Sequence, residues 1–292
     1  MSNNTVTNST TSQLDLSWLF ETNALKISPA GSPFWYTSGL IGPYYINTHF
    51  LCGGEKGALE LLDFIEQDAE NRIGFPARLM SRVEAIYNNF PIYRSVVDAL
   101  CKAAAEEFDL EKIDCVSGGQ RRDWFFAPIV AKKLNLPCIY LYNDLAITSE
   151  SGEAVSNLKG QRVMNIADLL TVGSSYSKKW IPAISNLGGK LEWSLNVVDR
   201  NEGAQENLRA CGVQKCHSLF VLGRELFDSA LSRGFIDKSQ YELAVGYLTN
   251  PQESMRTFLK SNPSFIEEAR SSSDEKKKAR CELMLKENLY NL

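Results

Sequence analysis

The hydrophobic pattern of the chain changes near residue 113. Before that point, residues 55–71 and 90–108 carry apolar side chains at helical spacing with polar residues opposite, which predicts two amphipathic helices. After it, short apolar runs alternate with helical segments, and the predicted strands are 113–117, 138–142, 163–167, 191–198 and 216–221. This alternation predicts an α/β fold with a central, mainly parallel sheet flanked by helices and joined by right-handed crossovers.

Three polar loops follow predicted strands and should therefore meet at one edge of the sheet. They span residues 118–123, 168–175 and 199–203. Ligands of parallel sheets bind beyond the carboxyl ends of the strands, so these loops are the candidate site. Helical patterns follow at 124–134, 175–187 and 204–211, and Pro182 should kink the second helix or mark a short first turn.

Turn residues and polarity define the remaining segments before residue 222. Aromatic and β-branched runs within 34–47 predict two short strands joined by a turn. This hairpin could form a lid or wall over a site, or it could only cover the core, and the sequence favours neither. Pro76 marks a break within 71–89, and the polar stretch 143–160 is typical of a long, mobile loop between strands.

The two ends of the chain differ from its middle, so we divide the sequence into three parts. Residues 1–23 are expected to form an arm, disordered at its Asn/Thr/Ser-rich start and without the features of a signal peptide, with a short helix over 14–22. Residues 24–221 form the α/β domain. Strand patterns then stop, which predicts a helical extension over 222–292 with capping cues at Asp237, Ser239 and Asn262-Pro263. We interpret the charge run 275–280 as a solvated helix face.

Composition restricts the class of partner. The chain has 292 residues, 44% of them hydrophobic and 23% charged, with a net charge of −4. These values fit a soluble globular protein and argue against nucleic acid or an acidic membrane surface as a partner. No apolar run approaches the length of a membrane span. Seven cysteines, an odd number scattered along the chain, favour a reduced, cytoplasmic setting.

The segment 161–175 carries the most informative chemistry. It reads as a strand, an acidic residue, a small-residue loop and a helix start, and such a loop aims backbone N–H groups at an anion, usually a phosphate. Asp168 beside it suits sugar hydroxyls or a hydrated divalent ion. The Gly-Lys-Ser/Thr of a Walker loop is absent. The alternative is an ordinary strand-to-helix turn capped by Ser174 or Ser175.

Three motifs carry a resemblance to a known family. Ile166-Ala-Asp-Leu-Leu-Thr-Val-Gly-Ser174 resembles the phosphoribosyl-pyrophosphate (PRPP) signature of type I phosphoribosyltransferases. Gly39-Leu-Ile-Gly-Pro-Tyr-Tyr-Ile-Asn47 and Val198-Asp-Arg-Asn-Glu-Gly203 are similar to segments of the orotate phosphoribosyltransferase branch. The order and spacing of the motifs match over residues 24–221, so the resemblance implies the phosphoribosyltransferase fold, with an N-terminal hairpin as a hood over the sheet.

The resemblance also implies roles for individual residues. The loop that would bind the 5′-phosphate consists of Thr171, Val172, Gly173, Ser174 and Ser175. The loop that would face pyrophosphate spans 118–123 and contains Gly118, Gly119, Arg121 and Arg122. Asp168 would bind the ribose hydroxyls, and Arg200 would contact the base or its carboxylate. Mg²⁺ would bridge pyrophosphate and ribose mostly through ligand oxygens and water, and the protein would be a homodimer.

The sequence departs from the family pattern at three places. The signature has two adjacent acids, and Ala167 stands in place of the first. The family's catalytic loop carries Lys and His, whereas residues 143–158 contain neither, and Lys159 is interpreted as a surface residue. Thr37 stands where the family has a lysine in the hairpin. Arg121 and Arg122 are candidates to compensate in part.

These observations lead to one leading hypothesis and two alternatives. The leading hypothesis is a phosphoribosyltransferase-like protein that binds PRPP or a nucleotide and transfers phosphoribosyl to orotate in pyrimidine biosynthesis. The first alternative is a catalytically impaired ligand sensor or interaction protein on the same fold. The second is a transferase for a different base, because the hairpin and the region of Arg200 set the choice of base.

Histidine and cysteine residues offer a weaker metal hypothesis. His49 and His217 are far apart in sequence, and the cluster of Cys211, Cys216 and His217 lacks a fourth ligand at zinc spacing. Packing in the core or at the surface is the favoured role for these side chains.

Overall fold

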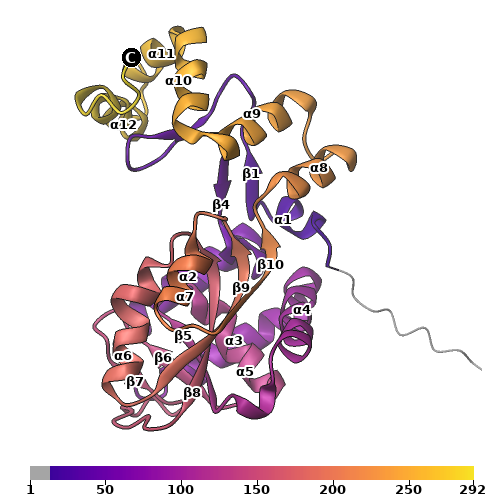
Figure 1. Cartoon of the computed structure of the whole chain (residues 1–292), viewed down its shortest axis with the longest axis vertical. Helices are drawn as coiled ribbons and strands as arrows, with labels where there is room; N and C mark the ends of the chain where they lie inside the picture. The colour runs from indigo at the N-terminus through magenta and orange to yellow at the C-terminus, as the bar shows by residue number, and fades with distance from the viewer. Residues whose placement is uncertain (1–13) are drawn as a thin grey trace, which may run out of the picture.

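The structure is a computed structural model that describes residues 14–292, so the first part of the expected N-terminal arm lies outside the described residues. Its centre is a six-stranded sheet in the order β10-β9-β8-β5-β6-β7. The bounds are β5 Cys115–Gly119, β6 Cys138–Leu141, β7 Ile147–Thr148, β8 Arg162–Leu170, β9 Lys190–Asp199 and β10 Lys215–Val221. All pairings are parallel except that of β6 with β7, so the predicted mainly parallel sheet is confirmed (Figure 1).

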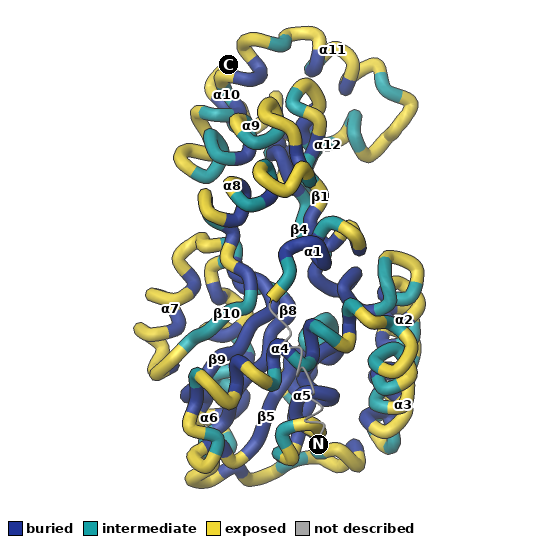
Figure 2. Tube along the Cα trace, turned by 90° about the vertical axis from the view of Figure 1, so that its right-hand side faces the viewer, coloured by how far each residue is buried: buried dark blue, intermediate teal, exposed yellow. Residues whose placement is uncertain are grey.

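Two hydrophobic layers cover the sheet because successive strand residues point to opposite faces. Val116 and Met164 belong to the larger layer, together with residues of α2 Gly54–Asp68, α3 Phe75–Asn89, α4 Pro91–Glu107 and α5 Ala127–Leu134. Cys115 and Val163 belong to the other layer, with residues of α6 Ile181–Asn186 and α7 Ala204–Ala210. The outer surfaces of α2 and α3 are exposed on one side of the molecule, and those of α6 and α7 on the other (Figure 2).

Several predicted boundaries need correction. The break that Pro76 predicted within 71–89 is confirmed, because residues 71–74 form a turn and Pro76 lies in the first turn of α3, where its missing N–H costs no intrahelical bond. Strand β5 begins and ends two residues later than predicted, so Gly118 and Gly119 are strand residues. Strand β8 continues to Leu170, which pairs with Asp199, so Asp168 lies inside the strand. The expected first turn at Pro182 is confirmed, because it opens α6 after a π-helical turn at Tyr176–Trp180.

The stretch 143–160, expected as an open loop, is fastened to the sheet. It contains β7, and Ile147 and Leu158 are buried in the layer of α6. The backbone N–H of Gly74 donates a hydrogen bond to the carbonyl of Ser151, and Arg72 pairs with Asp144. Buried apolar anchors and these polar contacts hold the segment against the edge of the sheet, and its first residue, Asn143, is hydrogen-bonded to Gln120 at 2.9 Å.

The N-terminal strands form two small antiparallel sheets instead of the single predicted hairpin. Strand β2 Phe34–Trp35 pairs with β3 Ile41–Gly42, as the aromatic run predicted. Strand β4 Tyr44–Ile46, however, pairs with β1 Leu25–Ile27, a strand that we did not predict. Pro43 lies between β3 and β4, and it lacks the N–H that a continuous ladder would need.

Five helices follow the last strand of the sheet. They are α8 Arg224–Ser232, α9 Lys238–Thr249, α10 Pro251–Ser261, α11 Ser264–Arg270 and α12 Glu275–Lys286. The predicted cap at Asp237 is confirmed, because its carboxylate accepts a hydrogen bond from the backbone of Gln240. The last three helices enclose a separate hydrophobic core around Trp35 and Ile41 of the hairpin, and Trp35 stacks on Phe265 with ring centroids 5.3 Å apart. The hairpin and these helices therefore fold together (Figure 1).

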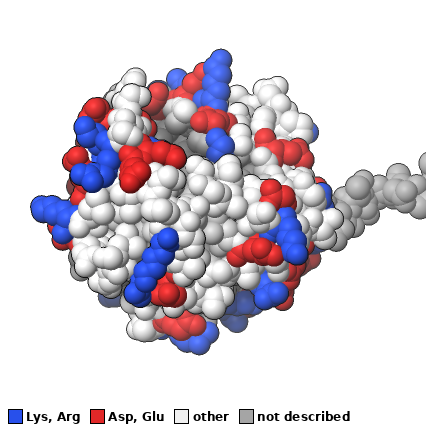
Figure 3. Space-filling view, turned by 90° about the horizontal axis from the view of Figure 1, so that it is seen from above, with Lys and Arg blue, Asp and Glu red and all other residues white. Residues whose placement is uncertain are grey.

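Among residues 14–292, no helix is long and apolar enough to cross a membrane. The face at the extension's end of the molecule shows lysine and arginine side chains interspersed with aspartate and glutamate around an uncharged centre (Figure 3). This face therefore presents no large patch of a single sign.

Candidate functional site

A cavity of about 280 Å³ lies at the carboxyl ends of β5 and β8, where the predicted phosphate and pyrophosphate loops meet. Ligands are expected at this edge of a parallel sheet. Its lining comprises Gly119, Gln120, Arg121, Arg122, Asp123, Ala167, Asp168, Leu169, Leu170, Thr171, Gly173, Ser174, Ser175, Tyr176 and Trp180. Two loops that are far apart in the sequence thus form one polar site.

The phosphate loop connects β8 to the π-helical turn. Gly173 has φ +74°, a left-handed conformation that a residue with a side chain rarely adopts, and the loop turns at this point. Ser174 and Ser175 are exposed and line the cavity, whereas Val172 points away and its carbonyl accepts a hydrogen bond from Asn207 at 2.9 Å. The loop is thereby anchored to α7 and leaves its small polar residues open to a ligand.

Two carboxyl groups lie together at the bottom of the cavity. Asp168 is buried, and its Oδ2 accepts a hydrogen bond from the hydroxyl of Thr48 at 3.1 Å. Asp123 accepts hydrogen bonds from the backbone N–H groups of Asp168, at 3.1 Å, and of Gly119, at 3.0 Å. Asp123 therefore ties the first loop to β8 and brings a second acid to the place where Ala167 supplies none.

Burial controls the charge of this pair. Removal from water raises the pKa of both carboxyl groups, and the neighbouring charge of Asp168 raises the pKa of Asp123 further. The guanidinium of Arg122 acts in the opposite direction on Asp168. A cation or hydroxyl donors in the cavity would favour the ionised forms. The pair is thus suited to a ligand that brings positive charge or hydrogen-bond donors.

The two arginines of the first loop differ in their surroundings. Arg121 lines the cavity but forms an ion pair with Glu66 of α2. Arg122 lines both this cavity and a second one, and its buried Nε has no hydrogen-bond partner among the described residues. Arg122 is therefore the cation of this loop that a ligand can engage. The peptide bond that precedes Arg121 in the same loop is cis.

The second cavity, of about 560 Å³, adjoins the first at Arg122 and Leu169. It lies between the sheet and the N-terminal strands, and its remaining lining is Tyr36, Thr37, Ser38, Tyr44, Tyr45, Ile46, Arg200 and Arg280. Arg200 pairs with Glu202 at 2.9 Å, and its buried Nε has no partner among the described residues. Of the two roles left open for the hairpin, the structure supports both: it forms a wall of this cavity and a part of a hydrophobic core.

The structure brings together most of the residues that the sequence predicted. Gly119, Arg121, Arg122, Asp168 and the phosphate loop except Val172 line the first cavity, and Arg200 lines the second. Gly118 does not line either; its carbonyl accepts a hydrogen bond from the indole of Trp124 at 2.8 Å.

Sequence reasoning missed three residues of the site. Thr48 carries no recognisable motif, and Asp123 was assigned only as part of a loop. Arg280 belongs to the charge run 275–280, and our expectation of a solvated face is wrong for this residue, although Lys276 is indeed exposed. A signal for Arg280 exists in the helical period, because it lies four residues before the buried Met284 and so on the same face of α12.

Tyr176 connects the phosphate loop to a buried polar network in the sheet. Its hydroxyl accepts a hydrogen bond from Asn165 at 2.9 Å, lies 2.6 Å from the hydroxyl of Ser194 and donates to Asn196 at 3.3 Å. Asn165 in turn accepts a hydrogen bond from Ser117 of β5 at 2.8 Å. The network crosses three strands and fixes the first residue after the phosphate loop.

Tyr176→Phe is expected to destabilise the protein by about 1–3 kcal/mol, because it leaves buried partners of the hydroxyl unsatisfied. Urea denaturation of the variant and the wild type measures this difference. Tyr241→Phe is the matched control, since it removes an exposed hydrogen bond to Asp228 (2.6 Å) and should have a much smaller effect. Equal effects of the two substitutions would contradict the role of the network.

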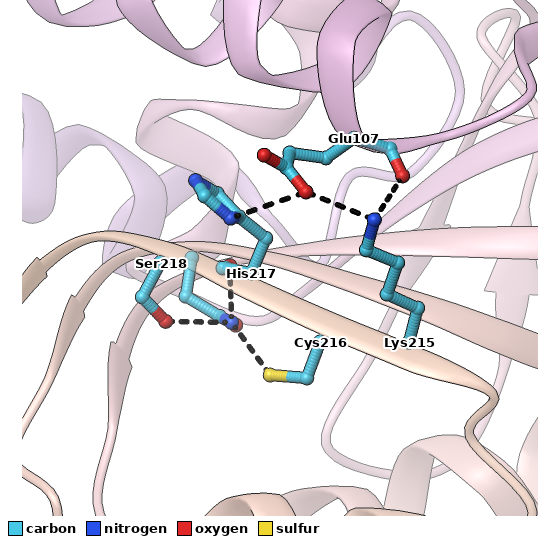
Figure 4. Close-up of polar contacts among 6 residues, drawn as sticks. Glu107, Lys215, Cys216, His217 and Ser218 are labelled. Carbon is cyan, nitrogen blue, oxygen red and sulfur yellow. Dashed lines mark hydrogen bonds and ion pairs between the residues drawn. The ribbon is translucent and has the colours of Figure 1, made fainter.

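The histidine and cysteine candidates do not form a metal site. Neighbouring residues of β10 point in opposite directions: His217 faces Glu107, at 3.9 Å, whereas Cys216 accepts a hydrogen bond from Asn196 at 3.2 Å (Figure 4). No group of three or more metal-ligating side chains occurs between residues 14 and 292. His49 is buried beside Phe50, and burial together with Arg122 lowers its pKa to about 4, so it is neutral at pH 7. The packing role that the sequence favoured is confirmed for His49.

Comparison with known proteins identifies the family. No family model matches the chain. The orotate phosphoribosyltransferase of Rhizobium johnstonii is 34% identical over 157 residues, which cover 53% of this chain and 68% of that protein. The orotate phosphoribosyltransferase of Methanocorpusculum labreanum is 31% identical over 116 residues, which cover 40% of this chain and 68% of that protein. The orotate phosphoribosyltransferase of Saccharolobus solfataricus is 28% identical over 165 residues, which cover 56% of this chain and 81% of that protein.

Solved structures support the same fold. Orotate phosphoribosyltransferase from Francisella tularensis has a TM-score of 0.52 at 13% identity, covering 80% of this chain and 96% of that one. UMP synthase from Leishmania donovani has a TM-score of 0.54 at 18% identity, covering 80% of this chain and 41% of that longer one. The structural likeness establishes a type I phosphoribosyltransferase fold, and the sequence identities establish the family. The resemblance seen in the sequence is thus confirmed: the chain belongs to the orotate phosphoribosyltransferase family.

Proposed function

We propose that this protein binds PRPP in the first cavity and transfers its phosphoribosyl group to orotate in the second, giving orotidine 5′-monophosphate and pyrophosphate. The observation that carries the proposal is the continuity of the two cavities. The first offers a phosphate loop and two carboxyl groups, and the second offers tyrosines and arginines, with Arg122 between them. A donor sugar and an anionic, planar acceptor would then meet at the boundary.

The residues would divide the work as follows. The 5′-phosphate would bind at Thr171–Ser175, the ribose hydroxyls at Asp168, and the pyrophosphate at Gly119 and Arg122. Transfer breaks the bond from the sugar's anomeric carbon to pyrophosphate and forms one to a ring nitrogen of the base, through an oxocarbenium-like centre. Arg122 would stabilise charge on the leaving pyrophosphate, and the protein would otherwise act by orienting both reactants and excluding water.

The donor set fits a magnesium ion that arrives with the ligand. Mg²⁺ prefers one or two carboxylates together with water and phosphate oxygens, and the pair of Asp123 and Asp168 offers such oxygens. The bound ion would neutralise pyrophosphate charge. We include Mg²⁺, a homodimeric state and a cytoplasmic location in the proposal on the strength of the family. Sedimentation of the purified protein would test the dimer.

A second candidate is a ligand sensor on the same fold with impaired catalysis. It is favoured by Ala167, by Thr37 in the second cavity and by the segment 143–158, which lacks Lys and His. That segment is also fastened at the edge of the sheet by β7 and Leu158. A transferase for another base is the remaining alternative, because the second cavity decides which base fits.

One experiment separates these candidates. Calorimetry with PRPP and Mg²⁺ measures binding, and release of pyrophosphate is followed with orotate, uracil, adenine and hypoxanthine in turn. We expect PRPP binding and orotate-dependent release. Binding without turnover would favour the sensor, and turnover with another base would favour the third candidate. If no phosphoribosyl ligand binds at millimolar concentration, the proposed function is wrong.

A further inference from the structure

The C-terminal helices contribute a charged side chain to the second cavity. Arg280 lies in α12, and it lines the cavity together with Arg122 and Arg200. No acidic residue is among the described residues that line this space. Arg200 is paired with Glu202, but Arg122 and Arg280 form no ion pair among the described residues, so the cavity carries an excess of positive charge and suits an anion.

Arg280 is held in a defined position. Its Nη1 donates a hydrogen bond to the backbone carbonyl of Trp35 at 2.8 Å, and the hydroxyl of Tyr45 donates to the same carbonyl at 2.6 Å. The helix that carries Arg280 packs on β2, with Cys281 buried in the core around Trp35. The side chain is thus preorganised at the wall of the cavity, with further N–H groups available to a ligand.

The other cations of the cavity also have donors without partners. The Nε atoms of Arg122 and Arg200 are buried, and neither has a hydrogen-bond partner among the described residues. Buried donors of this kind are normally satisfied, which points to a ligand that supplies acceptors. Tyr36, Tyr44 and Tyr45 add aromatic surface, which suits a planar ring.

We propose that Arg280 is a specificity-determining residue: the C-terminal extension completes the acceptor pocket, and Arg280 together with Arg200 recognises the acidic group of a planar heteroaromatic acceptor. This inference rests on the proposed function for the identity of the pocket. It assigns to α12 a part in substrate recognition, beyond its part in the hydrophobic core. An acceptor that lacks the acidic group gains nothing from Arg280.

The test compares Arg280→Gln with the wild type. Glutamine removes the charge and shortens the side chain, and the hydroxyl of Tyr45 still donates to the carbonyl of Trp35, so that carbonyl stays hydrogen-bonded and the local fold is kept. Arg270→Gln is the matched control, because Arg270 is exposed on α11 and the same charge is removed from the same extension. Arg280→Lys restores the charge without the planar fork of the guanidinium.

We expect Arg280→Gln to weaken orotate about tenfold to a hundredfold, both as KM and as the Kd from calorimetry, and to leave the Kd of PRPP within about twofold. Uracil, which has no carboxylate, should bind the variant and the wild type equally. Arg280→Lys should recover part of the affinity for orotate, and Arg270→Gln should behave as the wild type.

The outcomes separate this inference from the proposed function. Unchanged orotate affinity in Arg280→Gln, or an equal loss for PRPP and uracil, would overturn the inference even if the wild type turns over orotate. Binding of orotate that depends on Arg280 but occurs without turnover would support the inference and overturn the enzymatic proposal. A wild type that does not bind orotate at millimolar concentration would overturn both.

Discussion

Asp168→Asn is expected to lower phosphoribosyl transfer by about 10²–10³-fold without a loss of stability at pH 7. Under the proposed function, Asp168 binds the ribose hydroxyls and helps to hold the metal, and asparagine keeps the shape of the side chain but not its charge. Its amide oxygen can still accept the hydrogen bond from Thr48, so the local structure should survive. Steady-state kinetics with PRPP and calorimetry in the presence of Mg²⁺ measure the functional loss.

The expected pH dependence follows from the direction of the pKa shifts. Burial raises the pKa of Asp123 and Asp168 above their ordinary value of 3.8, so the folded state holds these protons more tightly than the unfolded state. The contribution of these two protons to the free energy of unfolding is fully present below the ordinary pKa of 3.8, and it is lost as the pH rises through the raised pKa values of the folded state. Asp168→Asn removes one titrating group and one neighbouring charge, so its stability should fall less over this window.

Glu192→Gln is the control for this experiment. Glu192 is buried near the opposite end of β9 and lines neither cavity of the site, so its substitution should leave turnover intact. Thermal denaturation at several pH values compares the two variants with the wild type. If Asp168→Asn retains turnover, the ribose role of Asp168 is wrong, and if it unfolds the protein, the carboxylate is a structural requirement instead.

The local part of the site could be predicted because it is continuous in sequence. A strand, an acid, a small-residue loop and a helix start were expected over residues 161–175, and the structure keeps this order except that Asp168 lies inside the end of the strand. The parallel sheet also places the loop at 118–123 at the same edge, as strand topology requires. Periodicity and turn chemistry were therefore sufficient for the five parallel strands of the sheet and for most of the first cavity, but not for the short antiparallel strand β7.

Contacts between distant segments could not be predicted from local pattern. The partner of Asp168 is Asp123, because β5 and β8 are neighbours in the sheet, and strand order is not encoded in either loop alone. Strand β4 pairs with β1 rather than with β2, the first strand of the predicted hairpin, and nothing in its own sequence selects between these partners. Arg280 follows exposed charges such as Lys276 in the sequence, and only the packing of α12 on the hairpin brings it to the cavity.

Trp35→Ala is expected to destabilise the protein by about 3–5 kcal/mol and to weaken orotate more than PRPP. Trp35 is buried, stacks on Phe265, and belongs to the core that joins the hairpin to the last three helices. Loss of the ring leaves a cavity in this core, and the hairpin also forms one wall of the acceptor pocket. The phosphate loop lies at the end of β8 and none of its residues belongs to this core, so PRPP affinity should change little.

Trp35→Phe separates loss of packing from loss of the indole. Phenylalanine can keep the stacking on Phe265, and it removes the indole N–H, which is buried without a partner among the described residues. This variant should therefore cost much less than Trp35→Ala and retain orotate affinity. Urea denaturation gives the stabilities, and hydrogen exchange of α10–α12 reports whether the extension opens. Unchanged exchange in Trp35→Ala would show that the extension is stable without the hairpin, and its proposed part in the acceptor pocket would then rest on Arg280 alone.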